Sequence, residues 1–311
     1  MLEIKQSQTL ESRQSQEGKC ILIVDDEAII RDLCSKALKG YRVLEAADGE
    51  EALIDPSNQN NVYGCSQYGA CLYSRNGGDT LSSFGSTNSI RYNWFTPVQF
   101  DPTNPAVMYL GGNRLHRSTN GAQTWTTISP DLTGGPGPDP NYVFGTITTV
   151  AASKSNSQVL FAGTDDGRVW TTPDLGATWI RVGQPGLPSF WVSRVAVDPT
   201  VASTAYVTFS GYRAGSNAPY VFRTVDGGTT WTDITGNLPQ APTTDIVVTA
   251  TALYVAGDAG VFRSTNGGAT WLRVGKGLPR VPVDDIELVA STNQLFAGTF
   301  GRGMWRVQLP G

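Results

Sequence analysis

An eight-residue pattern recurs five times along this chain and constrains the fold more than any other feature. The pattern is Ser/Thr-x-Asp/Asn-x-Gly-x-Thr-Trp, with Ala122 replacing Gly once and Leu81 replacing Trp once. Successive copies start 44, 54, 52 and 40 residues apart. Repetition at such a period predicts supersecondary units that pack against their neighbours. The copies are SRNGGDTL (74–81), STNGAQTW (118–125), TPDLGATW (172–179), TVDGGTTW (224–231) and STNGGATW (264–271).

Each copy lies between two short segments in which polar and apolar residues alternate, such as VFRT before 225 and WTDIT after 230. An Asn or Asp followed by Gly between such segments predicts a β-hairpin turn, because the side chain accepts backbone N–H groups and Gly adopts positive φ. We expect the Trp to hold each hairpin against a neighbouring sheet. The predicted structural residues are Asn76, Asn120, Asp174, Asp226, Asn266, Trp125, Trp179, Trp231 and Trp271.

A second recurring unit precedes the turns, and FDPTNPAVMYLGG (100–112) and VDPTVASTAYVTFSG (197–211) are two of its six copies. The unit is a strand, a Pro/Asn turn and another strand. Together with the two strands that flank each turn, it makes a four-stranded unit of the size of a propeller blade. The sequence therefore predicts a mainly-β fold, a propeller of about six four-stranded blades over residues 54–311. The sequence leaves open whether the ring closes.

The repeated pattern resembles the Asp box, or BNR repeat, of sialidases, sortilin-type receptors and xyloglucanase-like glycosidases. RYNWFTPVQFDPTNPAVMYLGGNRLHRSTNGAQTW and the late GTFGRGMWR also look like the large multi-repeat proteins of this superfamily. The resemblance covers residues 54–311 and implies a β-propeller. It assigns no activity, because in those families the box is a surface turn remote from the ligand.

Residues before 54 differ in composition from the rest. Seven of the eight Glu lie before residue 54, and all eight Trp lie after it. Residues 1–18 are polar and are expected to be a disordered leader. CILIVDDE (20–27) predicts a buried parallel strand, 28–40 an amphipathic helix, YRVLEA a second strand over 41–46, and 48–53 the start of a second helix.

This βαβα order resembles a truncated response-regulator receiver domain over residues 19–53, a doubly wound α/β fold. The resemblance implies that Asp25 and Asp26 match an acidic pair that helps to bind Mg²⁺ in that family. The phosphoacceptor Asp and the Thr/Ser and Lys strands that complete the site do not follow. We therefore expect a vestigial, non-functional metal site and no phosphotransfer.

Charge and hydropathy argue against several partners. The net charge is −4 with no basic stripe, so no nucleic-acid partner is expected. No run of eighteen apolar residues occurs, and the N-terminus lacks the apolar core of a secretory signal, so we expect no membrane partner and a cytoplasmic chain as written. Propellers of the resembled families are often exported. No cofactor is expected, and the oligomeric state is left open.

The four cysteines fall into two pairs. Cys20 and Cys34 are predicted to be buried, inert thiols. Cys65 and Cys71, in GCSQYGAC, could bridge the two strands of a hairpin, which would suit an exported ancestor. Because the chain carries no export signal, free thiols are the expectation for this pair.

Candidate catalytic groups are few, and no catalytic residue is predicted. Glu287 is the only Glu after residue 54, which disfavours a sialidase with a Glu-assisted Tyr nucleophile. Other glycosidases need two carboxylates across the scissile bond. Asp165–Asp166 and Asp284–Asp285 are candidates, but adjacent strand residues point to opposite faces, so neither pair is itself a dyad. His116, the only His, is expected to be structural.

Six aromatic residues lie in longer segments between the repeats, where they could stack on sugar rings or on peptide side chains. Packing between blades is the alternative for these residues. The leading hypothesis is a non-catalytic binding or structural module for a glycan or protein, and the alternative is a glycoside hydrolase fragment. A phosphorelay regulator with a propeller output is disfavoured, and a gene-fusion product without selected function stays open. The six are Tyr92, Trp94, Phe95, Phe190, Trp191 and Tyr212.

Overall fold

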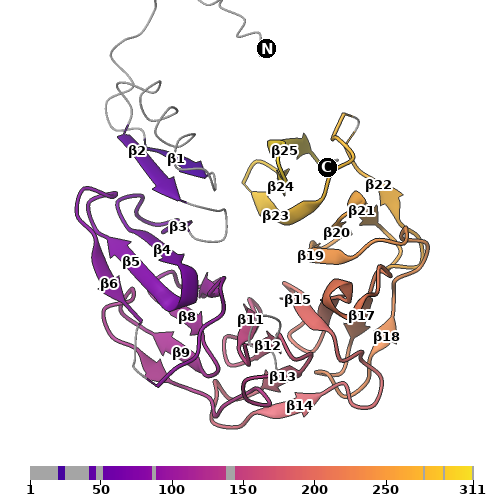
Figure 1. The fold of residues 1–311 in the computed structure, drawn as a ribbon, viewed down its shortest axis with the longest axis horizontal. Helices are drawn as coiled ribbons and strands as arrows, with labels where there is room; N and C mark the ends of the chain where they lie inside the picture. The colour runs from indigo at the N-terminus through magenta and orange to yellow at the C-terminus, as the bar shows by residue number, and fades with distance from the viewer. Residues whose placement is uncertain are drawn as a thin grey trace, which may run out of the picture.

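The computed structural model describes residues 20–24, 42–46, 52–85, 89–137, 144–275, 277–289 and 291–309. From residue 52 onward these residues form six antiparallel sheets arranged as blades around a common centre (Figure 1). The predicted mainly-β propeller of about six blades is therefore confirmed. Neither of the two short 3₁₀ helices that the structure describes has the length or apolar character of a membrane-spanning segment.

Within each blade the strands pair in chain order, because each is joined to the next by a hairpin. Figure 1 shows β11, β15, β19 and β23 facing the centre of the ring. The first three blades contain β3 (Ala52–Ile54), β4 (Val62–Ser66), β5 (Ala70–Ser74), β6 (Ser82–Phe84); β7 (Val98–Phe100), β8 (Met108–Gly111), β9 (Leu115–Ser118), β10 (Thr126–Thr127); and β11 (Ile147–Ala152), β12 (Leu160–Thr164), β13 (Val169–Thr172), β14 (Ile180–Val182).

The last three blades follow the same plan, although the sixth has three strands among the described residues. Two 3₁₀ turns, η1 (Gln67–Gly69) and η2 (Tyr212–Ala214), interrupt the first and fourth blades. The strands are β15 (Trp191–Val197), β16 (Ala205–Ser210), β17 (Val221–Thr224), β18 (Thr232–Asp233); β19 (Thr243–Val248), β20 (Leu253–Gly257), β21 (Gly260–Ser264), β22 (Leu272–Arg273); and β23 (Val283–Val289), β24 (Gln294–Thr299), β25 (Gly303–Gln308).

The five repeated turns share one arrangement of hydrogen bonds. In the fourth turn, Oγ1 of Thr224 accepts the N–H of Gly228 at 2.9 Å, and the Asp226 carboxylate accepts the N–H of Thr230 at 2.9 Å. The other four turns repeat the second contact through Asn76, Asn120, Asp174 and Asn266, at 2.8–3.0 Å. Two successive residues of every turn have positive φ, and Ala122 and Leu175 are the two that are not Gly.

Three of the tryptophans in these turns contact the preceding blade. The indole N–H groups of Trp179 and Trp271 donate to the carbonyls of Ile128 and Ile234 at 2.8 and 3.0 Å. Trp125 stacks on Phe84 of the first blade, with ring centroids 5.6 Å apart. The indole N–H of Trp231 donates within its own turn, to the Gly228 carbonyl. The turns therefore tie each hairpin to its surroundings at the periphery of the ring.

The hydrophobic core consists of five clusters, each between two successive blades. The cluster between the third and fourth blades contains Phe161, Val192 and Phe209, and the cluster between the fourth and fifth contains Val255 and Trp271. The other three clusters fill the remaining interfaces of successive blades in the same way. Sheets packed face to face bury the apolar residues of both, which explains why the alternating strands of the sequence fold as blades.

Before the propeller, β1 (Cys20–Val24) and β2 (Arg42–Ala46) pair in parallel, as two strands predicted there would. The helix expected over 28–40, the leader, Cys34, Asp25 and Asp26 lie outside the described residues. The helix expected from residue 48 does not extend over Ala52 and Leu53, which form β3 because Leu53 packs against the core of the first blade. A parallel pair alone gives no support to the receiver resemblance.

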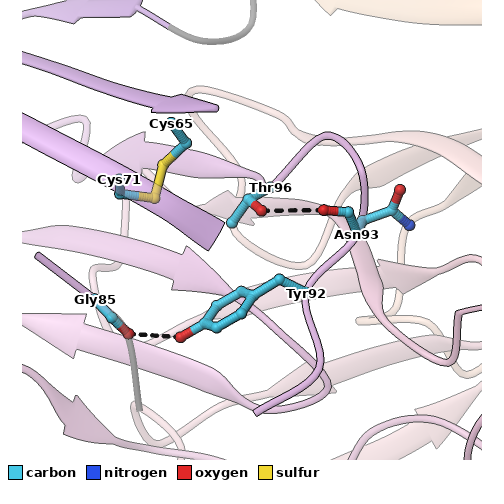
Figure 2. The surroundings of a disulfide bond; sticks show 6 residues. All are labelled: Cys65, Cys71, Gly85, Tyr92, Asn93 and Thr96. Atoms are coloured by element: carbon cyan, nitrogen blue, oxygen red, sulfur yellow. Dashed lines mark hydrogen bonds between the residues drawn. A yellow bond between two sulfur atoms is a disulfide. The ribbon is translucent and has the colours of Figure 1, made fainter. Parts of the chain in front are cut away.

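Cys65 and Cys71 form a disulfide, contrary to the expected free thiols (Figure 2). They lie directly opposite each other in β4 and β5, so the hairpin itself brings the two sulfur atoms together. Both residues are buried in the cluster between the first and second blades. The expectation of free thiols was wrong, because the register of the hairpin places the two cysteines opposite each other.

Candidate functional site

A cavity of about 580 Å³ opens at the end of the ring where the inner strands begin. It is large enough for a ligand of several rings, since small-molecule sites usually measure about 300–1,000 Å³. Its wall consists of the inner strands of the third to sixth blades, the segments next to them, the tip of the β4–β5 hairpin and the segment before β7. The lining residues are Tyr68, Asn93, Trp94, Phe95, Phe144, Thr148, Trp191, Ser193, Ser210, Tyr212, Arg213, Thr244 and Asp284.

Four successive inner strands carry a β-bulge at the same place. The register of each with its neighbour skips one residue, and the skipped residues are Thr148, Ser193, Thr244 and Asp284. All four line the cavity. A bulge adds a residue to one strand and re-aims its side chain. The bulges therefore turn one side chain per blade toward the cavity.

Three of these bulged residues tie each blade to the next. The hydroxyl of Thr148 donates to the carbonyl of Val192 at 2.6 Å, and the hydroxyl of Ser193 donates to the carbonyl of Thr243 at 3.0 Å. The hydroxyl of Thr244 donates to the carbonyl of Val283 at 2.6 Å. Each acceptor is the residue just before the bulge of the following blade. The three hydroxyls thus form successive hydrogen bonds that link the third to sixth blades along the cavity wall.

Asp284 occupies the fourth bulge, where a carboxyl group replaces the hydroxyl. The side chain of Asp284 is exposed to the cavity. The surrounding protein nevertheless shields its carboxyl group from bulk water, and this loss of hydration raises the pKa of Asp284 above the usual value of 3.8. The negative charge of Asp258 raises the pKa further. Asp284 is the one carboxylate among the described lining residues. It is therefore the group of this cavity best suited to donate a proton.

Aromatic rings form one wall of the cavity. Tyr68, at the tip of the β4–β5 hairpin, makes edge contacts with Trp94 and Phe144 at centroid distances of 5.4 and 6.0 Å. Tyr68, Trp94 and Phe95 remain 51%, 40% and 46% exposed. Rings held together with their faces accessible are suited to stack on an apolar ligand face. We call Tyr68, Trp94, Phe95 and Phe144 the aromatic wall.

Another part of the cavity wall carries a cation. The guanidinium of Arg213 lies 4.2 Å from the ring centroid of Trp191, which is a cation–π contact. Tyr212, its neighbour in η2, is 68% exposed. One face of Trp191 is therefore covered by Arg213, whereas Tyr212 is largely exposed.

The structure brings four of the six predicted aromatic residues into the cavity and places two elsewhere. Trp94, Phe95, Trp191 and Tyr212 line it. Tyr92 is buried and donates its hydroxyl to the carbonyl of Gly85 at 2.6 Å (Figure 2), and burial raises its pKa to about 12. Phe190 packs on Tyr220 between the third and fourth blades. These two rings serve packing between blades, the alternative considered for the whole set.

The paired aspartates have structural partners. Asp165 accepts the N–H groups of Phe144 and Thr146 at 2.7 and 2.9 Å, and Asp166 pairs with Arg168 at 2.9 Å. Asp285 forms an ion pair with Arg194, while Asp284 faces the cavity. Among these four aspartates Asp284 alone lines the cavity, so neither pair forms a dyad there.

His116 lies outside the cavity. His116 is buried in β9 and contacts the Thr127 hydroxyl at 3.1 Å, and its burial lowers its pKa. Across the described ranges no group of three His, Cys, Asp or Glu residues could hold a metal ion. The lining residues Tyr68, Phe144 and Arg213 were missed from the sequence, because nothing local distinguishes them from other loop residues.

Comparison with known proteins identifies similar folds. No family model matches the chain. A xyloglucanase of a Paenibacillus species is 26% identical over 192 residues, which represent 51% of this chain and 18% of that protein. The crystal structure of an ancestral GH74 enzyme matches with a TM-score of 0.63 and 20% identity, over 83% of this chain and 36% of that one. YCF48 bound to D1 peptide matches with a TM-score of 0.57 and 15% identity, over 83% and 78%.

These similarities establish the propeller fold. This chain spans about a fifth of the xyloglucanase and about a third of the GH74 enzyme.

Proposed function

We propose that this propeller binds a glucan chain of the xyloglucan type in the cavity, as the glycan-binding part of a glycoside hydrolase. The aromatic wall carries the proposal. Three of its rings are 40–51% exposed inside a cavity of about 580 Å³, and the apolar faces of sugar rings stack on such rings. The hydroxyls of Ser210 and Tyr212 supply hydrogen-bonding groups around them.

The relatives support a glucan over other glycans. A relative in sequence is named a xyloglucanase, and a solved structure with the same propeller fold is named a GH74 enzyme. In this proposal the five repeated turns are Asp boxes. Their hydrogen bonds lie within the turns, at the periphery, so they stabilise the blades and do not contact the ligand.

Hydrolysis requires a second carboxylate. Glycosidases place two carboxyl groups about 5–9.5 Å apart across the scissile bond, whereas Asp284 alone lines this cavity in the described part of the chain. In the proposed function Asp284 is the proton donor, and the second carboxyl group comes from a residue that is not among the described lining residues of the cavity. This chain by itself is therefore expected to bind glucan and to release few or no reducing ends.

A peptide is the second candidate ligand. YCF48, which was solved with D1 peptide, shares the fold over 78% of its own length. The cavity combines exposed rings with the Arg213 guanidinium, and such a combination also suits an extended peptide with aromatic or acidic side chains.

Calorimetric titration of the full chain distinguishes the two ligands. Xyloglucan oligosaccharides, cello-oligosaccharides and a panel of acidic and aromatic peptides are titrated under one buffer condition. Saturable binding of xyloglucan oligosaccharides, with a matching rise in melting temperature, supports the glucan proposal, because a ligand that binds only the native state stabilises it. Binding of peptides with none of the glucans contradicts it.

A further inference from the structure

We infer that the Cys65–Cys71 disulfide and Gly69 position Tyr68 for ligand contact, and that Tyr68 determines affinity in this cavity. The inference rests on the proposed function, since it assigns Tyr68 to the same ligand. Tyr68 is the lining residue that the β4–β5 hairpin contributes to the aromatic wall. Its side chain is half exposed and reaches across to rings from two other segments of the chain.

The disulfide closes the hairpin just below its tip. Cys65 and Cys71 face each other across β4 and β5, and only five residues separate them in the chain. Both sulfur-bearing side chains are buried in the core between the first and second blades. The covalent bond therefore anchors both arms of a very short loop to the core, and Tyr68 lies at the middle of that loop.

The backbone at the tip adopts conformations that side chains rarely adopt. Tyr68 has φ 57° and ψ 39°, in the left-handed region that is uncommon for a bulky residue. Gly69 follows with φ 78°, and a Cβ there would lie 2.5 Å from the ring of Tyr92. Such a backbone persists only where the surroundings fix it. Outliers of this kind gather at binding sites, which is consistent with a role for Tyr68 in binding.

Non-covalent contacts connect the tip to the rest of the aromatic wall. The N–H of Tyr68 donates to the carbonyl of Asn93 at 3.2 Å, next to Trp94. The Asn93 carbonyl also accepts the Thr96 hydroxyl (Figure 2), and the Asn93 amide donates to Thr146 at 2.8 Å. The hairpin tip and the segment that carries Trp94 therefore hold each other. Without the disulfide, this hydrogen bond, the ring contacts of Tyr68 and the pairing of β4 with β5 would have to hold the tip.

A double-mutant cycle tests whether the disulfide acts through Tyr68. Cys65→Ala/Cys71→Ala removes the bond without burying a new polar group, and Tyr68→Ala removes the ring. Each change alone is expected to weaken binding of a xyloglucan oligosaccharide by about five- to tenfold. Their combination is expected to weaken it no further than Tyr68→Ala alone, because the disulfide has no ring left to position.

Tyr212→Ala is the matched control. Tyr212 is another exposed tyrosine of the cavity, but it lies in η2 of the fourth blade, away from the hairpin. Loss of the disulfide should therefore add fully to the effect of Tyr212→Ala. Full additivity with Tyr68→Ala as well, or unchanged affinity in the disulfide-free variant, would overturn the inference.

Amide exchange gives a readout that does not depend on any ligand. The N–H of Tyr68 should exchange faster in the disulfide-free variant. The N–H of Ile246 donates to the Asp245 carboxylate and should stay protected in the same variant. Unchanged exchange at Tyr68 would refute the positioning role. If the wild-type chain binds no glucan but Tyr68 exchange changes as expected, the proposed function fails and the positioning role stands.

Discussion

The guanidinium of Arg194 in β15 lies 2.5 Å, Nε to Oδ1, from the carboxylate of Asp245 in β19. Arg194 also pairs with Asp285 in β23, so one side chain joins the inner strands of three successive blades. Asp245 itself is buried, and its second oxygen accepts the N–H of Ile286 at 2.8 Å. These contacts join the inner strands of the fourth to sixth blades and hold β23, which carries Asp284.

Removal of the Asp245 carboxylate should destabilise the propeller strongly. Asp245→Ala leaves the N–H groups of Ile246 and Ile286 without their acceptor and removes one partner of Arg194. We expect a loss of about 2–3 kcal/mol in the free energy of unfolding, measured in urea. Asp233→Ala, at an exposed position of β18, should cost less than about 1 kcal/mol. Equal losses in the two variants would contradict the structural role of the Arg194–Asp245 pair.

Asp284 should make the fold less stable as the pH rises, whereas most carboxylates of folded proteins make it more stable. Because the folded pKa of Asp284 is raised, the folded state holds its proton more tightly than the unfolded chain does. Its ionisation therefore lowers stability as the pH rises from below 3.8 through the raised pKa. Asp284→Asn is expected to raise the melting temperature at pH 7 and to leave it nearly unchanged at pH 3. A gain of the same size at both pH values would argue against the raised pKa.

The repeated turns allow a matched comparison of two neighbouring glycines. Gly227 and Gly228 both have positive φ, but a Cβ at Gly227 meets nothing within 4 Å, whereas one at Gly228 lies 2.9 Å from Val182. Gly227→Ala should cost about 1–2 kcal/mol through backbone conformation alone. Gly228→Ala should cost more, because Val182 of the preceding blade must move. Thermal melts of both variants show whether the turns contact the preceding blade as described.

The blades were predictable from the sequence because the information for them is local and repeated. Asn or Asp with Gly defines each turn, and alternation defines the strands around it, so aligned copies predict six similar sheets. The pattern at Asp226, for example, is sufficient to predict the hydrogen bond to Thr230. Local patterns also predicted that His116 lies within a strand.

The cavity was only partly predictable, because register and packing between blades create it. The bulges that direct Thr148, Ser193 and Thr244 toward the cavity become visible only when the strands are paired. Alignment of the repeated units does, however, place these three residues at the same point, just after the start of each inner strand. Tyr92 and Trp94 are two residues apart and equally aromatic, yet one is buried and the other lines the cavity.

The direct test of the central claim is the affinity of two tryptophan variants for a xyloglucan oligosaccharide. Trp94 in the aromatic wall and Trp305 in β25 are both 40% exposed, but only Trp94 lines the cavity. We predict that Trp94→Ala weakens binding by about tenfold or more, whereas Trp305→Ala leaves the affinity of the wild-type chain unchanged. Equal affinities for Trp94→Ala and the wild type, or a loss confined to Trp305→Ala, would show that glucan does not bind in this cavity.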